Sequence, residues 1–174
     1  VQDRFPLLAL EIEVDISPNL HERLRAQEID LGFLLGQVTA PNALSMPLMT
    51  YPLAFISSPD ISWPRRPARI EEIERFPIVT FSRNTQPYAA VAALFNGPRS
   101  PQTRLHASAS LATVVRMTVE KLGVAVIPPA IVAKEIERGE LRIVRSEAQL
   151  PDLEFHASWI DHPASRAASE IAAI

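Results

Sequence analysis

The side chains that could support catalysis or bind a metal have no suitable spacing in this sequence. The histidines, at positions 21, 106, 156 and 162, are far apart, and none has a second ligand at metal-site spacing. His21-Glu22 begins like the His-Glu-x-x-His helix of zinc proteases, but the fifth position of that motif is Arg25. There is no Gly-x-Ser-x-Gly nucleophile turn, no glycine-rich phosphate loop and no cysteine. We therefore predict that this is not an enzyme, with no catalytic residue, no metal site and no cofactor.

One arginine has the surroundings expected of a binding group. Arg83 lies between Ser82 and Asn84, directly after the apolar run "PIVTF" and shortly before a helix that begins near Pro87. A guanidinium in such a loop can hold a carboxylate through two parallel hydrogen bonds. Most arginines are exposed and close a surface loop, so this second interpretation of Arg83 remains open.

Two serines, Ser108 and Ser110, precede the most regular helical pattern of the chain. Apolar residues at positions 111, 114, 115, 119 and 122 share one face of a helix. The two hydroxyls could hydrogen-bond a ligand, or Ser110 could be the N-cap of that helix. We expect Gly123 to close the helix as a C′ glycine.

These polar residues are positioned by strands that alternate with helices along nearly the whole chain. The pattern "LLALEIEVDI" at 7–16 alternates partly apolar and acidic residues, which predicts a strand. Ser17-Pro18 is a helix start, with Ser17 as N-cap and Pro18 at the first helical position. Further strands are expected at 29–35, 46–57, 77–81, 103–108, 124–127, 141–144 and 153–160, and further helices at 69–76, 87–95, 110–122, 131–139 and 162–174. This order indicates an α/β fold with mostly parallel sheets.

Three of the expected strands end in the same way, with a polar or proline break before a helix. The breaks are at 15–18, 81–87 and 127–129. Pro128 keeps Ile127 extended, and Pro129 fits the first helical position, where its missing N–H costs nothing. Such junctions are where α/β proteins bind ligands, and helix N-termini there favour anions. Since every α/β protein has such junctions, a purely structural role also remains open.

Composition excludes several classes of protein. The chain has 174 residues, a formal net charge of −3 and no apolar run of the length, about 18 residues, that spans a membrane. A negative net charge gives no electrostatic footprint for nucleic acid. The absence of cysteine fits a reducing cytoplasm, which we predict as the location.

Taken in order, several segments resemble the effector-binding domain of LysR-type transcriptional regulators. They are "LEIEVDISPNLHERLRAQEIDLGFLLG" at 10–36, "PLMTYPLAFISSP" at 47–59, "FPIVTFS" at 76–82 and "LGVAVIPPAIV" at 122–132, followed by "GEL" at 139–141. The most specific feature is the pairing of "EIDLGF" with "GVAVIP" later in the chain. The resemblance covers essentially the whole sequence.

The resemblance implies a two-subdomain fold of the periplasmic-binding-protein type 2, with mixed, mostly parallel sheets flanked by helices. Subdomain I would comprise 1–50 and 151–174, and subdomain II would comprise 51–150. The crossovers would lie at Tyr51 and at 149–151. An effector cleft would lie between the two subdomains.

The resemblance also implies an N-terminal winged helix-turn-helix domain, a linker helix and a first strand upstream of residue 1. Residues 1–6, "VQDRFP", are typical of the last turn of a helix ended by proline, so we expect an upstream segment on this ground too. Without that first strand, its neighbours would have unpaired ladder groups, and we expect a poorly stable isolated polypeptide.

The family's effector contacts transfer to several positions of this chain. They are the Ser17 junction, the loop after Asp30, the loop of Ser82, Arg83 and Asn84, the helix start at Ser108 and Ser110, and Pro128 at the rim of the implied cleft. Some members that respond to aromatic acids carry a basic residue where this chain has Leu34 or Leu35. This departure leaves Arg83 as the main cationic candidate. A family glycine is replaced by Lys121, so we expect the helix to run through Lys121.

The resemblance therefore favours the sensor half of a bacterial transcription factor. A small molecule would bind between the subdomains and change the assembly of a homodimer or homotetramer on DNA, which the chain would contact only through the absent domain. No membrane partner is expected. The alternative is a solute-binding protein of a transporter, since a shared fold does not fix function.

Overall fold

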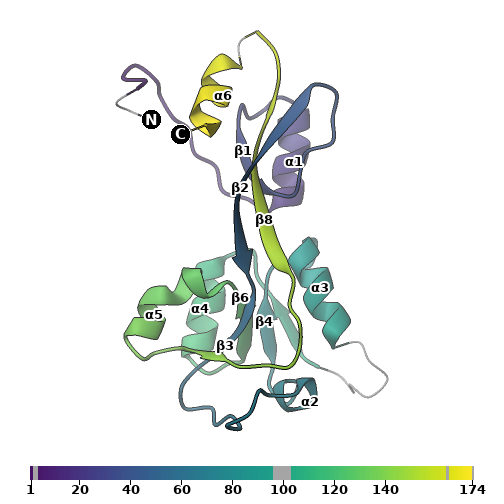
Figure 1. The fold of residues 1–174 in the computed structure, drawn as a ribbon, viewed down its shortest axis with the longest axis vertical. Helices are drawn as coiled ribbons and strands as arrows, with labels where there is room; N and C mark the ends of the chain where they lie inside the picture. The colour runs from purple at the N-terminus through teal and green to yellow at the C-terminus, as the bar shows by residue number, and fades with distance from the viewer. Residues whose placement is uncertain (2–3, 96–102, 164, 174) are drawn as a thin grey trace. The chain divides into compact units, whose positions relative to one another are not determined.

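The computed structural model describes residues 1, 4–95, 103–163 and 165–173 and divides the chain into two compact units (Figure 1). Unit 1 comprises Val1–Thr50 and Glu154–Ile174, and unit 2 comprises Tyr51–Leu153. Strands β2 (Ala43–Pro52) and β8 (Asp152–Ile160) both cross the boundary between the units. The sequence placed the subdomain boundaries at 50/51 and 150/151, and the units divide at 50/51 and at 153/154, the latter inside β8.

The core of unit 2 is a mixed sheet of five strands. Their order is β5 (Leu105–Ala107), β4 (Ile78–Thr80), β6 (Val124–Ile127), β3 (Ala54–Ser57) and β7 (Arg142–Val144). Strand β4 runs parallel to both β5 and β6, and β3 runs antiparallel to both β6 and β7. The mixed α/β character is confirmed, and the parallel pairs of this sheet are those around β4.

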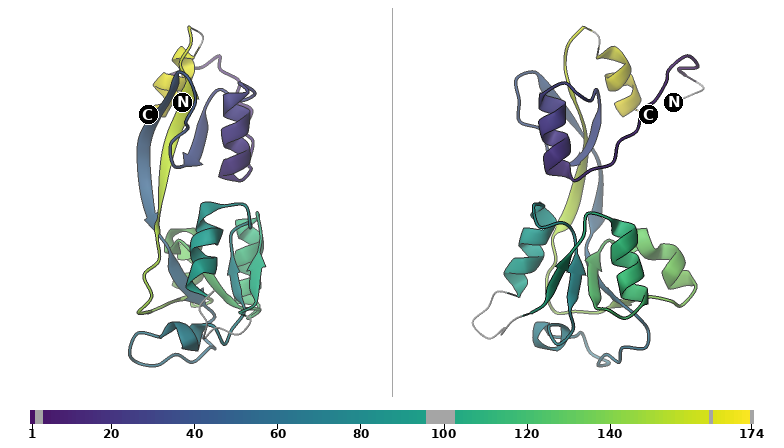
Figure 2. Two further views of the ribbon diagram at one scale, coloured as in Figure 1. Left: turned by 90° about the vertical axis from the view of Figure 1, so that its right-hand side faces the viewer. Right: turned by 180° about the vertical axis from the view of Figure 1, so that it is seen from behind.

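Helices cover both faces of this sheet. Helix α4 (Leu111–Val119) and helix α5 (Ala133–Glu137) pack against the core cluster that contains Ile56. Phe55 precedes Ile56 in β3, and its side chain points to the other face of the sheet because side chains alternate along a strand. There its ring meets Phe95, just after helix α3 (Gln86–Leu94), with centroids 6.5 Å apart in an edge-on arrangement. Figures 1 and 2 show α3 on one side of the sheet and α4 and α5 on the other.

The end of α4 differs from the sequence-based expectation in two respects. The helix ends at Val119 and does not run through Lys121, which has a φ of 62°. Lys121 N donates to Thr118 O at 3.1 Å and Leu122 N donates to Met117 O at 2.9 Å, the bonds of a Schellman cap. Lys121 is therefore the left-handed C′ residue, and the assignment of Gly123 to this role was wrong.

Gly123 is needed for a different reason, the close approach of β6 to β4. A Cβ atom on Gly123 would lie 2.3 Å from the carbonyl oxygen of Pro77. Val124 N donates to that same oxygen at 2.8 Å, which begins the pairing of the two strands. The glycine thus serves the sheet, while the helix before it closes on a strained lysine.

The double proline after β6 behaves as predicted. All four residues of β6 are buried, and Pro128 follows with φ −61° and ψ 132°, an extended conformation. Pro129 is the first residue of a 3₁₀ helix, Pro129–Val132, which continues into α5. Gly139, with a φ of 71°, follows the end of α5. The strand end and the helix start are confirmed.

Unit 1 contains a smaller sheet of three strands in the order β1 (Gly32–Leu35), β8, β2. Strand β1 pairs with β8 antiparallel and is an edge strand. Helix α1 (Ser17–Arg25) covers one part of this unit through the cluster of Leu24, Leu34 and Val38. Helix α6 (Arg166–Ala172) packs through Ala168 and Ala172 on Ala157 and Trp159 of β8.

The strand predicted at 7–16 is not formed. Residues 8–16 have no assigned secondary structure, and the apolar side chains up to Val14 are exposed, with Ile12 at 81% and Val14 at 94%; Ile16 is half-buried. The contacts that hold it are polar: Glu13 pairs with Arg23, and Asp15 accepts two hydrogen bonds from the Asn19 amide at 3.0 Å. An apolar alternation forms a strand only beside a hydrogen-bonding neighbour, and the described chain places none there.

The predicted last turn of a helix at 1–6 falls partly on residues 2–3, which lie outside the described residues. Phe5 N donates to Val1 O at 2.8 Å, which closes one turn. In the part of the chain that the structure describes, no helix is both long and apolar enough to cross a membrane.

Candidate functional site

Three strand ends of unit 2 form one edge of its sheet. Since β4 is parallel to β5 and β6, their carboxyl ends lie side by side, and each is followed by a helix. We define the strand-end rim as residues 81–86, 108–112 and 128–130, which connect these strands to α3, α4 and the 3₁₀ turn. The rim contains most of the predicted binding residues, namely Ser82, Arg83, Asn84, Ser108, Ser110 and Pro128.

Thr80, which sequence analysis did not single out, ties the three strands together beneath the rim. It is fully buried, and its hydroxyl donates to Val126 O of β6 at 3.1 Å. Its carbonyl oxygen accepts from Ser108 N, just after β5, at 3.1 Å. The only hint of this role in the sequence is that a threonine stands in the apolar run "PIVTF", at a buried position where a valine or isoleucine would be expected.

The loop after β4 is held in place from below and leaves its polar side chains outside. The Thr85 hydroxyl donates to Ser82 O at 2.6 Å and accepts from Tyr88 N at 3.4 Å, so Thr85 caps α3. Arg83 and Asn84 are exposed. The Arg83 guanidinium carbon lies 5.9 Å from the centroid of the Tyr88 ring, a cation–π contact.

The two serines of the second rim segment have local roles. The Ser110 hydroxyl accepts from Thr113 N at 3.3 Å, so the N-cap interpretation of Ser110 is confirmed. The Ser108 hydroxyl accepts from Ser110 N at 3.1 Å and can donate to Ser110 O at 3.2 Å. These bonds leave the hydroxyl hydrogen of Ser110 available to a ligand. The N–H groups of Leu111 and Ala112, in the first turn of α4, also lack intrahelical acceptors.

The predicted residues of unit 1 form a separate group. Ser17 is not an N-cap: the N-cap of α1 is Ile16, and the Ser17 hydroxyl accepts from Leu35 N at 3.1 Å. His21 Nε2 lies 3.2 Å from Leu35 O, so both backbone polar groups of Leu35 contact α1. Leu34 is fully buried, whereas Leu35 is half-buried. The structure brings Ser17 and Leu35 together and shows that Ser17 has a structural role in unit 1.

The rim is distinctive in its charge. Arg83 is the only charged residue among residues 81–86, 108–112 and 128–130, and its neighbours carry hydroxyls, amides and backbone N–H groups. Within the described residues, no group of three or more histidine or carboxylate side chains could hold a metal ion. The rim therefore offers hydrogen-bond donors and acceptors, and its single charge, on Arg83, favours a negatively charged ligand group.

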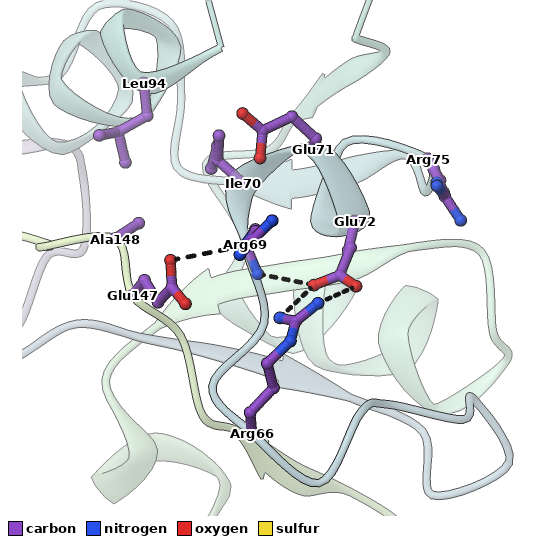
Figure 3. A pocket seen from close by; sticks show the side chains of 9 residues that line it. All are labelled: Arg66, Arg69, Ile70, Glu71, Glu72, Arg75, Leu94, Glu147 and Ala148. Carbon is purple, nitrogen blue, oxygen red and sulfur yellow. Dashed lines mark hydrogen bonds and ion pairs between the residues drawn. The ribbon is translucent and has the colours of Figure 1, made fainter.

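A hollow of about 720 Å³ in unit 2 lies elsewhere, around helix α2 (Ile70–Ile73) (Figure 3). Two of its arginines have carboxylate partners: Arg66 makes a bidentate contact with Glu72 at 2.8 and 2.9 Å, and Arg69 Nε lies 4.0 Å from a carboxylate oxygen of Glu147. The hydrogen bond from Arg66 lowers the pKa of Glu72, with a second contribution from Arg69 N. Charges that already satisfy each other leave little to bind a ligand, so we assign these residues to the folding of the loop before α2.

Comparison with solved structures identifies relatives of the same fold. Full-length OxyR C199D from Pseudomonas aeruginosa superposes with a TM-score of 0.81 at 20% identity, over 99% of this chain and 60% of that one. The regulatory domain of CcmR from Synechocystis PCC6803, in complex with 2-PG, gives 0.79 at 14% identity, over 98% of this chain and 83% of that one. The bromide-bound regulatory domain of HypT from Salmonella typhimurium gives 0.76 at 16% identity, over 98% and 82%.

No curated protein matches the sequence itself. The structural relatives confirm the type 2 periplasmic-binding-protein-like fold implied by the resemblance. The model of the LysR substrate binding domain family matches residues 1–173, which is all but the last residue. The chain therefore belongs to the LysR substrate binding domain family, the effector-binding domain of LysR-type transcriptional regulators.

Proposed function

We propose that this chain senses a small-molecule effector for a bacterial LysR-type transcriptional regulator, and that the strand-end rim supplies effector contacts. The observation that carries this proposal is the family match over residues 1–173. It is supported by the convergence of three parallel strand ends at one edge, since ligands bind at the carboxyl ends of parallel strands. The predicted rim residues then have a common role that their separate places in the sequence do not reveal.

Relatives of this fold are known with small ligands, namely CcmR with 2-PG and HypT with bromide. Both of these ligand-bound proteins are regulatory domains, which favours a sensor over a solute-binding protein of a transporter. The relatives called OxyR include a C199D variant and a reduced form, but this chain has no cysteine. Its signal therefore has to come from a ligand or another change, and not from a disulfide within these residues.

The chain spans 60% of the length of full-length OxyR. DNA binding through a winged helix-turn-helix domain outside these residues is part of the proposal, as is assembly into a homodimer or homotetramer. An effector can act on such an assembly only if it binds one of two states more tightly. The same coupling is what a solute-binding protein would lack, because it has no DNA-bound state.

A thermal-shift screen of metabolites against the full-length protein tests the proposal. A compound that binds only the folded state must raise the unfolding temperature. We expect at least one hit whose shift shrinks in Asn84→Ala at the rim. The matched control is Gln149→Ala, an exposed amide of unit 2 away from the rim. A screen without hits would contradict effector sensing, whereas hits that respond equally to both variants would contradict the assignment of the rim.

A further inference from the structure

The strand-end rim has a charge pattern that limits what it can bind. Its three segments supply one cation, Arg83, and no carboxylate. Among exposed groups, the Arg83 guanidinium and the Asn84 amide are donors that project from the loop after β4. A ligand carboxylate or phosphate group would meet donors and a positive charge there, whereas a ligand cation would meet no counter-charge.

The second rim segment adds donors of the same kind. Ser110 already accepts from Thr113 N, so its hydroxyl hydrogen is the group that remains free for a ligand. The N–H groups of Leu111 and Ala112 point along the axis of α4 toward the rim, as first-turn N–H groups do. The helix start by itself would not make a site, but it agrees in sign with Arg83.

Arg83 is also held by a neighbour. Its guanidinium lies over the Tyr88 ring at 5.9 Å, and Tyr88 belongs to the first turn of α3, which Thr85 caps. In the described residues, Arg83 has no carboxylate partner within salt-bridge distance, unlike Arg66, which binds Glu72. A guanidinium that is oriented by an aromatic ring and has no carboxylate partner is free to bind the negative charge of a ligand.

We propose that the effector of this domain is a small anion, a carboxylate or a phosphate ester, whose charge binds Arg83, and that Tyr88 positions Arg83 for it. This inference rests on the proposed function, because it names the chemical class of the effector at the same rim. It is specific to this chain, since Leu34 and Leu35 offer no cation in unit 1. Bromide, the ligand of the HypT regulatory domain, is an anion, in agreement with this inference.

The test uses matched acids and amides on the full-length protein at fixed ionic strength, with the same chloride concentration in every measurement. The probes are glycolate with glycolamide, succinate with succinamide, and 2-phosphoglycolate with inorganic phosphate. Thermal shift selects the probes that bind, and calorimetry gives Kd. We expect acids to bind and their amides to fail, and the phosphate probes show whether a carboxylate or a phosphoryl group is preferred.

Three arginine variants assign the charge. Arg83→Gln should weaken Kd by about tenfold or more, because a charge-assisted hydrogen bond is lost. The Kd of Arg83→Lys should lie between those of the wild type and Arg83→Gln, since lysine keeps the charge but cannot make a bidentate contact. Arg75→Gln removes the same charge from an exposed position by α2 and should leave Kd unchanged.

Tyr88 is tested by two variants with a built-in rescue. Tyr88→Leu removes the ring and should weaken Kd by about two- to fivefold, the size of an exposed cation–π contact. Tyr88→Phe keeps the ring and should restore the affinity. The unfolding temperature without ligand should be equal in the two variants, which separates positioning of Arg83 from a loss of stability.

The possible failures can be told apart. Amides that bind as tightly as acids, or an Arg83→Gln variant with unchanged Kd, would overturn the anion assignment and leave effector sensing intact. The same holds if only neutral compounds from a wider metabolite screen bind at the rim. If no compound of either kind binds, the proposed function itself fails.

Discussion

Two segments of this chain have strongly apolar strand patterns and opposite structures. Residues 124–127 form β6, in which every residue is buried between β4 and β3. Residues 7–16 form no strand, and all their apolar side chains except the half-buried Ile16 lie in solvent. The difference is in the neighbours: β6 has a hydrogen-bonded strand on each side, while the described residues supply none for 7–16.

The comparison shows what an apolar pattern does and does not encode. A pattern states which face of a strand would be buried, but the backbone N–H and C=O groups need partners from elsewhere. In unit 2 those partners are in the same unit, so pattern and structure agree. In unit 1 the sheet ends at β1, and an equally clear pattern remains unused.

The largest expected effect compares one isoleucine from each segment. Ile127→Ala should lower the free energy of unfolding by about 2–5 kcal/mol, because Ile127 is fully buried in the core of unit 2. Ile12→Ala should change it by less than about 0.5 kcal/mol, because Ile12 is exposed. Urea unfolding followed by tryptophan fluorescence measures both.

The tryptophans make this comparison specific to each unit, since Trp63 lies in unit 2 and Trp159 in unit 1. Trp159→Phe leaves unit 2 as the reporter, and Trp63→Phe leaves unit 1. A loss of more than about 1 kcal/mol for Ile12→Ala would show that residues 7–16 are buried in solution, and would break the contrast drawn above.

The second effect concerns the close approach of β6 to β4. Gly123→Ala places a Cβ against the Pro77 carbonyl oxygen and should cost about 2–3 kcal/mol. The matched control is Gly139→Ala, where nothing lies within 4 Å and the cost, about 1 kcal/mol, comes from a φ of 71° alone. Equal losses in urea unfolding would mean that the strands can separate around the new methyl group.

Sequence reasoning located most of unit 2 because its elements are locally complete. The run "GVAVIPP" predicted a buried strand, its end and the following helix, and all three are confirmed. The family resemblance supplied the fold and the grouping of Ser82, Arg83 and Ser110, which lie far apart in the sequence. The binding roles of these residues stay predictions.

Three of the misses share a cause, which is that the deciding contact is distant in sequence. Ser17 has the sequence of an N-cap, but its hydroxyl binds Leu35 N, eighteen residues away. Gly123 has the sequence of a C′ glycine, but the backbone of Pro77 requires it. Thr80 has no unusual sequence context, and only its bond to Val126 reveals its role.

A third test concerns helix ends, because in each unit a helix is followed by a non-glycine residue with a positive φ. Gln27 after α1 and Lys121 after α4 are non-glycine residues with φ of 57° and 62°. Gln27→Gly should raise the free energy of unfolding of unit 1 by about 0.5–1 kcal/mol, by relieving the left-handed strain. Lys121→Gly should gain less, because it also removes the contact of the Lys121 ammonium with Asp60.

Thermal unfolding compares these two variants, with Lys121→Asn as a control that tolerates the left-handed conformation and also lacks the ammonium. If Lys121→Gly stabilises as much as Gln27→Gly, the ion pair with Asp60 contributes nothing measurable, as is common for exposed pairs.

The smallest effect compares two exposed ion pairs, Arg66–Glu72 in unit 2 and Arg23–Glu13 in unit 1. Glu72 also accepts a hydrogen bond from Arg69 N at 2.8 Å, which fixes its side chain at the start of α2. Glu13, in contrast, belongs to the segment 7–16, which forms no strand. Glu72→Gln should therefore lower the urea midpoint slightly, and Glu13→Gln should leave it unchanged.

The dependence on pH identifies the cause of the Glu72 effect. Arg66 and Arg69 lower the pKa of Glu72 below its ordinary value of 4.5, so its ionised form is favoured in the folded state. The stabilisation is then fully present above pH 4.5 and is lost as the pH falls through the lower folded pKa. The difference in urea midpoint between wild type and Glu72→Gln should be constant from neutral pH down to about pH 5 and close below it. A difference that persists at pH 3 would mean that Glu72 acts through packing and not through its charge, and the two ion pairs would then differ in geometry alone.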